Sequence, residues 1–146
     1  MLGIWTKLGP ALALVLAFPG SAGAAGSAPG QAIPPPANLA AELQQRPGHQ
    51  AMDVALRWEG IGDPAASYEV EQVIRHREMV GPFRPLGARH GSEQFPDGHF
   101  EFVVMDAFLP GFEGWMCYRV RAVIRGNAGP HTGEVCVPGP QARGTP

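Results

Sequence analysis

Large apolar residues occupy every second position in several segments of the chain. The clearest segment is 52–59, where small or polar residues fill the places between Met52, Val54, Leu56 and Trp58. A period of two is typical of a β-strand that buries one face. This segment therefore predicts a strand with those four side chains directed into a core.

The segment 68–74 follows the same rule and predicts a second strand, which begins after a turn at Gly62-Asp63-Pro64. We expect one face of it to carry Tyr68, Val70 and Ile74, and the other to carry Glu69, Glu71 and Val73.

Further strands are predicted at 100–105, at 115–124 and, after a turn at 126–130, from about Thr132 to Val137. Residues 81–98 are interrupted by Pro and Gly, so they predict only one short edge strand near 83–88. The expected buried positions of the 115–124 strand are Met116, Tyr118, Val120 and Ala122.

The segment 39–45 leaves two alternatives open. Pro36 and Pro47 leave room for barely two turns of helix between them, while the alternation of Leu39, Ala41 and Leu43 fits a first strand equally well.

The first 24 residues have the order of a secretory signal peptide. Lys7 is the only charged residue before Glu42, an apolar run spans 11–18, and Ala22-Gly23-Ala24 supplies the small residues that a signal peptidase requires. We expect cleavage near Ala25 and a secreted or periplasmic protein. An uncleaved anchor is the alternative, and only then do we expect a membrane partner; the apolar run alone is too short to cross about 30 Å of hydrocarbon.

Gly- and Pro-rich segments flank the region that carries the strand pattern. Residues 25–36 predict an extended linker with three consecutive prolines, and 138–146 predict a disordered tail. The folded unit between them, 37–137, has the length of one domain.

Composition narrows the function classes further. The 146 residues are 45% apolar and 16% charged, which argues against a chain that is disordered throughout. A formal charge of -2 gives no long-range field that would attract nucleic acid, so we expect no nucleic-acid partner.

The sequence of the folded unit resembles that of a known domain family. The chain is similar to a fibronectin type III domain, and the similarity rests on Pro35-Pro36 followed by Leu39, Val54-x-Leu56-x-Trp58, Tyr68-x-Val70, and the run Tyr118 to Val123 followed by Gly129. The resemblance implies an all-β, seven-stranded, two-sheet immunoglobulin-like sandwich, with Trp58 between the sheets and Tyr68, Tyr118 and Val120 in the core.

One corner departs from the family pattern. Leu109-Pro110 is followed by a longer segment than usual, and Met116 stands where the family has a tyrosine that closes the corner by a hydrogen bond.

Cys117 and Cys136 are the two cysteines of the chain, and they are placed nearly symmetrically about Asn127 in the predicted last hairpin. Two cysteines in an exported chain should be oxidised, and their parity allows them to face each other across adjacent strands. We therefore expect a disulfide. A reactive or metal-binding thiol pair is the alternative.

No cluster of residues specifies catalysis, a cofactor or a metal. The histidines lack a chelating spacing, and Ser67 and Ser92 lack the glycine-flanked turn that exposes a nucleophile. If the family pairing holds, Glu69 and Glu71 form an ion-pair ladder with Arg119 and Arg121. The five histidines are His49, His76, His90, His99 and His131.

Arg125, Gly126 and Asn127 occupy the turn from which members of the family often present a ligand-binding tip. The alternative is that Asn127 and Gly129 simply permit a tight turn.

The sequence therefore favours a non-catalytic secreted or periplasmic module that binds a protein or glycan. The alternative is a small secreted enzyme or enzyme inhibitor that uses residues 79–98 as its loop. Convergence of His90, Asp97 and an arginine in a concave pocket would favour that alternative.

Overall fold

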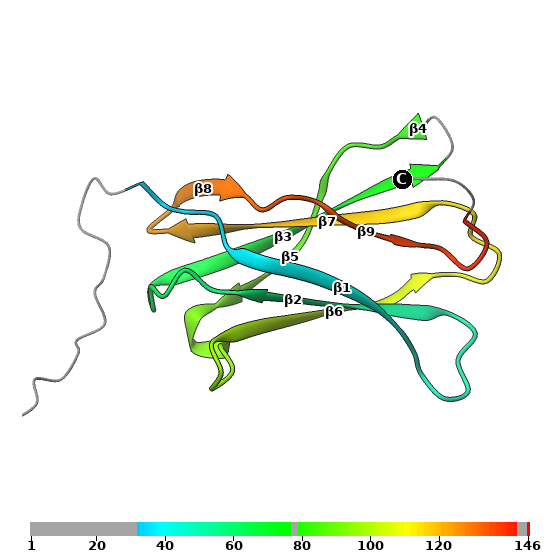
Figure 1. Cartoon of the computed structure of the whole chain (residues 1–146), viewed down its shortest axis with the longest axis horizontal. Coiled ribbons are helices and arrows are strands. Elements are labelled where there is room, and N and C mark those ends of the chain that lie inside the picture. The colour runs from blue at the N-terminus through cyan, green and yellow to red at the C-terminus, as the bar shows by residue number, and fades with distance from the viewer. Residues whose placement is uncertain (1–31, 77–78, 143–145) are drawn as a thin grey trace, which may run out of the picture.

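Two antiparallel β-sheets pack face to face in the computed structural model, which describes residues 32–76, 79–142 and 146 (Figure 1). The smaller sheet has the order β1-β2-β6, in which β1 is Ala37–Gln45, β2 is Met52–Glu59 and β6 is His99–Phe108. The larger sheet is centred on β3 and β7. Its members are β3 (Ala66–His76), β4 (Met79–Val80), β5 (Arg84–His90), β7 (Trp115–Ile124), β8 (Asn127–His131) and β9 (Val135–Pro138).

The sandwich reduces to seven strands when interrupted strands are counted once. Both β4 and β5 pair with β3, and both β8 and β9 pair with β7. Each pair therefore behaves as one strand that breaks midway. The predicted all-β, two-sheet fold class is confirmed.

The core lies between the sheets and is dominated by aromatic rings. Trp58 is fully buried, stacks on Phe100 with ring centroids 5.8 Å apart, and meets Tyr68 across the sandwich at 6.1 Å. The Tyr68 hydroxyl accepts a hydrogen bond of 2.9 Å from the Ile61 N–H, which fixes the turn between β2 and β3. Tyr118 and Val120 are fully buried in the same cluster.

The segment 39–45 is part of strand β1 and not a helix, because residues 40–45 pair with β2 without a break. The folded part of the chain also begins before β1, and not at residue 37 as predicted. Ile33 packs against the core cluster, and Gly129 makes room for it: a Cβ at Gly129 would lie 2.6 Å from the Ile33 Cγ2 atom. The last residues of the predicted linker, 32–36, therefore lie on the sandwich.

The regular pairing of β3 with β7 confirms the predicted faces, with Ile74 on the side of Val70 and Val73 on the side of Glu71. Burial at the end of the strand does not follow the faces. Ile74 is 46% exposed, whereas Val73 is 1% exposed. The neighbouring strand, made of β4 and β5, is interrupted between them. The groove at this interruption leaves Ile74 uncovered beside Gly81. Val73 is paired with Cys117, where the disulfide shields it from solvent.

The predicted turn at 126–130 is wrong. The turn consists of Arg125 and Gly126, whose φ angles are 50° and 81°, and Asn127 already pairs with Ile124 as the first residue of β8. Positive φ at both central residues is what a tight type I′ hairpin requires. The hydrogen-bonded strand follows at once, and it breaks again between β8 and β9.

The corner between β6 and β7 is closed without a tyrosine hydroxyl. Phe112 packs on Phe108 with centroids 5.4 Å apart, and the carbonyls of Phe112 and Gly114 accept backbone hydrogen bonds from Gln141 and Gly139. The first part of the segment predicted as a tail, 138–146, therefore packs on this corner.

The predicted signal peptide, 1–24, lies outside the described residues, as do most of the linker and residues 143–145. Within the described ranges, no helix has the length and apolarity needed to span a bilayer.

Trp58→Ala should lower the free energy of unfolding by about 3 to 5 kcal/mol, because it leaves a cavity between the two sheets. Chemical denaturation monitored by circular dichroism measures this loss. Leu109→Ala is the control: Leu109 is 66% exposed, so we expect a change within about 0.5 kcal/mol. Equal stabilities for the two variants would contradict the central position of the indole.

Candidate functional site

The outer face of the larger sheet carries charges that neutralise one another. Arg119 pairs with Glu71 at 2.6 Å and Arg121 with Glu69 at 2.7 Å, which is the predicted ladder. His131 adds a contact of 3.2 Å to Glu71, and the Arg119 guanidinium lies 3.6 Å from the centroid of the Phe83 ring. This face therefore offers little net charge to a partner.

The ladder also shifts two pKa values. Desolvation tends to raise the pKa of Glu71, but the hydrogen bond and charge of Arg119 outweigh it, so the pKa lies below its ordinary value. Desolvation and the charge of Arg119 lower the pKa of His131. Glu71 therefore stays ionised and His131 neutral near pH 7.

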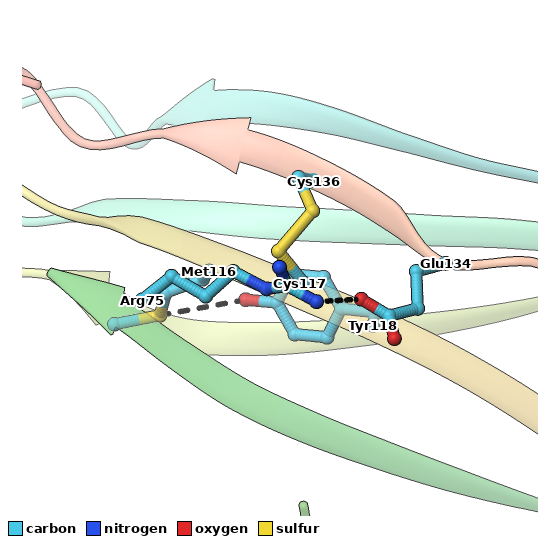
Figure 2. Close-up of a disulfide and its surroundings, with 6 residues drawn as sticks. All are labelled: Arg75, Met116, Cys117, Tyr118, Glu134 and Cys136. Carbon is cyan, nitrogen blue, oxygen red and sulfur yellow. Dashed lines mark hydrogen bonds and ion pairs between the residues drawn. A yellow bond between two sulfur atoms is a disulfide. The ribbon is translucent and has the colours of Figure 1, made fainter. Parts of the chain in front are cut away.

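The predicted disulfide is present between Cys117 and Cys136 (Figure 2). The pairing depends on an irregular ladder. If the hairpin stayed regular from the Ile124–Asn127 pair onward, Cys117 would lie opposite Glu134. Two interruptions of the ladder shift the register by two residues, so Cys117 lies opposite Cys136 instead. Glu134 turns to Arg75, with an ion pair of 2.5 Å beside the bridge.

The bridge decides between the two alternatives for the cysteines. The Glu134 carboxylate lies close to both sulfur atoms, a grouping that could hold a metal if the sulfurs were thiolates. Because the sulfurs are bonded to each other, neither cysteine offers a thiolate in this state.

The loop tip predicted as a binding site is exposed at Arg125, Gly126 and Asn127. Its backbone conformation is accounted for by the type I′ turn, which places both Arg125 and Gly126 at positive φ.

The segment 79–98 does not assemble the predicted catalytic group. Asp97 pairs with Arg57 at 2.9 Å and with His99. His90 instead pairs with Ser67 in the sheet, and its N–H donates to Glu93 at 2.6 Å. His90 and Asp97 are therefore held by different partners.

His99 is the centre of a polar cluster that the sequence did not reveal. Its ring stacks on Phe95 at 4.5 Å and contacts Arg57 at 3.0 Å and Glu101 at 3.2 Å. Desolvation tends to raise the pKa of Asp97, but the hydrogen bonds from His99 and the charges of His99 and Arg57 keep it below its ordinary value.

The outer side of the smaller sheet contains a groove of about 430 Å³. Ala40 and Ala55 contribute short side chains, so the surface is low where neighbouring strands carry longer ones. Glu42 borders it on β1, and Glu101 and Val103 border it on β6.

Carboxylates outnumber basic groups around this groove. Arg46 is shared by Asp53 and Asp106, and Arg57 is bound to Asp97, whereas Glu42 and Glu59 have no ion-pair partner among the described residues. We call this surface the acidic face. Its carboxylates are Glu42, Asp53, Glu59, Asp97, Glu101 and Asp106, and its arginines are Arg46 and Arg57.

Comparison with known proteins identifies the fold. No protein-family model matches the sequence, and no curated protein matches it. A solved structure described as the fourth FNIII domain of a human protein is similar in shape: it is 16% identical, with a TM-score of 0.53 over 87% of this chain and 98% of that chain. The chain therefore has a fibronectin type III-like fold.

Reduction of the disulfide should lower the free energy of unfolding by about 3 kcal/mol, because the bridge joins cysteines 19 residues apart and constrains the unfolded chain. Urea denaturation with and without a reductant measures the difference, and intact mass confirms the gain of two hydrogens. The Cys117→Ala/Cys136→Ala variant is the control, since a reductant should leave it unchanged. If the parent is equally stable in both conditions, the bridge has no such role.

Proposed function

We propose that this protein is an exported, non-catalytic module that binds another protein through its acidic face. The observation that carries the proposal is the groove on the smaller sheet, which is bordered by more carboxylates than arginines. A concave surface with an excess of one charge selects partners of the opposite charge and speeds their encounter.

The contrast between the two outer faces supports this choice of surface. On the larger sheet each carboxylate of the ladder is neutralised by an arginine, and a partner would first have to break those pairs. On the acidic face Glu42 and Glu59 are exposed and have no ion-pair partner within the described part of the chain, so a basic group can reach them without such a cost.

The charge also favours a partner class. Lysine and arginine side chains of a protein complement the acidic face, whereas nucleic acid and anionic lipid would be repelled by it. Neutral glycans would gain nothing from the excess carboxylates. We therefore propose a basic protein segment as the partner.

Export is supported by the order of residues 1–24 and by the disulfide, because disulfides persist mainly in oxidising compartments. The use of 79–98 as an enzymatic or inhibitory loop gains no support, since His90 and Asp97 are held apart by separate partners.

The exported protein should begin within a few residues of Ala25, because Ala22-Gly23-Ala24 forms the cleavage motif. Intact-mass analysis of protein recovered from the periplasm or the culture medium measures this. Recovery of a chain that retains residues 1–24 would contradict export by cleavage.

Ala55→Arg should abolish capture of the partner, because the long basic side chain fills the groove and reverses its charge. Tagged parent and variant are each exposed to an envelope or culture-supernatant extract, and the captured proteins are compared by quantitative mass spectrometry.

Arg125→Ala is the matched control for this experiment, since it removes the exposed side chain of the loop tip and leaves the acidic face intact. We expect it to retain the proteins that the parent captures and Ala55→Arg loses. Loss with Arg125→Ala and retention with Ala55→Arg would assign binding to the loop tip instead, and cooperative melting of both variants establishes that they are folded.

A further inference from the structure

We propose that β6 receives an extended, basic segment of the partner as an additional β-strand. This inference rests on the proposed function and adds to it how the partner binds. It makes the smaller sheet four-stranded in the complex and places the partner's side chains next to those of Glu101, Val103 and Met105.

The free edge of β6 is the first observation. Among the described strands, β6 pairs only with β2, and it lies along the lower margin of the molecule in Figure 1. Two other edges are protected: β1 lies against β9, and β5 contains Pro85, which cannot donate to a neighbouring strand. The β4 edge is open as well, but it is only two residues long. The sequence of β6 contains neither proline nor lysine, the residues that commonly protect an edge.

One contact establishes which backbone groups face outward. The Glu101 carbonyl accepts a hydrogen bond of 2.9 Å from the Arg89 Nε atom, which comes from the other sheet. Because backbone direction alternates along a regular strand, Val103 directs its N–H and carbonyl groups to the free edge, as Glu101 does. The register of the ladder shifts between Val104 and Phe108, so this alternation carries no further than Val104.

The side chains of the same residues are unusually apolar for an open edge. Val103 is 44% exposed and Met105 is 62% exposed, and both lie on the outer face with Glu101. An added strand would cover these two side chains while its backbone pairs with that of Val103. Affinity would then come from main-chain hydrogen bonds, and specificity from alternate side chains.

The charge of this edge favours a basic segment over a second copy of the chain. Pairing β6 with its own copy would bring two acidic faces together along one seam, and the arginines beside the edge, Arg57 and Arg89, are already bound to carboxylates. A segment with lysine or arginine beside Glu101 and an apolar residue beside Val103 complements both features.

Two capped nine-residue peptides provide the test. In the basic probe, threonine occupies every second position, and lysine and valine alternate at the remaining positions. The acidic probe has glutamate in place of each lysine. Each is titrated into the purified, isotopically labelled exported protein while amide chemical shifts and hydrogen exchange are followed by nuclear magnetic resonance.

We expect the basic probe to shift the amide signals of Val103 and Met105 and to slow the exchange of the Val103 amide, with affinity falling roughly tenfold on a tenfold rise in salt. The acidic probe should bind at least tenfold more weakly. Equal binding of both probes, or shifts confined to the larger sheet, would overturn the basic-strand proposal. A concentration-dependent dimer with the same protected amides would show that a second copy occupies the edge.

The variant Val103→Pro separates strand addition from binding by the face alone. Proline removes the outward N–H and is tolerated at an edge strand because no bond to β2 is lost. We expect at least tenfold weaker binding of the basic probe, whereas Val103→Thr, which keeps the N–H and the branched shape, should bind within threefold of the parent.

The outcomes separate this inference from the proposed function. If Val103→Pro binds the probe as well as the parent does but Ala55→Arg does not, the acidic face binds without strand addition, and only this inference fails. If neither substitution affects capture of the natural partner, the proposed function fails as well. Thermal melting of each variant shows whether the fold is retained.

Discussion

The burial of Trp58 between the sheets is the constraint on which the rest of the molecule depends. Its stacking on Phe100 and its contact with Tyr68 fix which faces of β2 and β6 point inward. Because side chains alternate with a period of two, a slip of one residue would exchange the buried and exposed sets. The same constraint therefore places Ala55, Arg57 and Glu101 together on the outside, and the groove follows from the core.

The second sheet depends on a different constraint, the register of the last hairpin. The turn at Arg125 and Gly126 starts a regular ladder, and the interruptions before β9 displace it until Cys117 and Cys136 are opposite. The bridge then holds the broken strand in place and shields Val73. The exposed charges here are neutralised by pairs with Arg119 and Arg121, so this half of the sandwich is stabilised internally. On the smaller sheet, Glu42 and Glu59 form no ion pair with any other residue that the structure describes.

The sequence predicted those strands whose burial pattern depends only on neighbouring residues along the chain. The alternation at 52–59 and at 115–124 identified two strands because each buries one face along its whole length. Ile74 escaped the same reasoning because its exposure depends on where another strand breaks. The groove could not be predicted at all, since Ala40, Ala55 and Val103 become neighbours only through the pairing of three strands, and alanine in a strand carries no signal of a depression.

An open sheet edge with exposed apolar side chains is normally a liability, because it can pair with any other exposed strand. The chain limits this risk in ways that still leave the edge usable. Arg89 occupies the Glu101 carbonyl, Asp106 lies at a positive φ of 50° where the β2–β6 ladder is interrupted, and the surrounding carboxylates repel a second copy. Charge therefore excludes the commonest wrong partner, the chain itself, while Val103 and Met105 remain open to a basic strand. Such an edge is selective without being closed, which is the property that a binding surface built on a sheet requires.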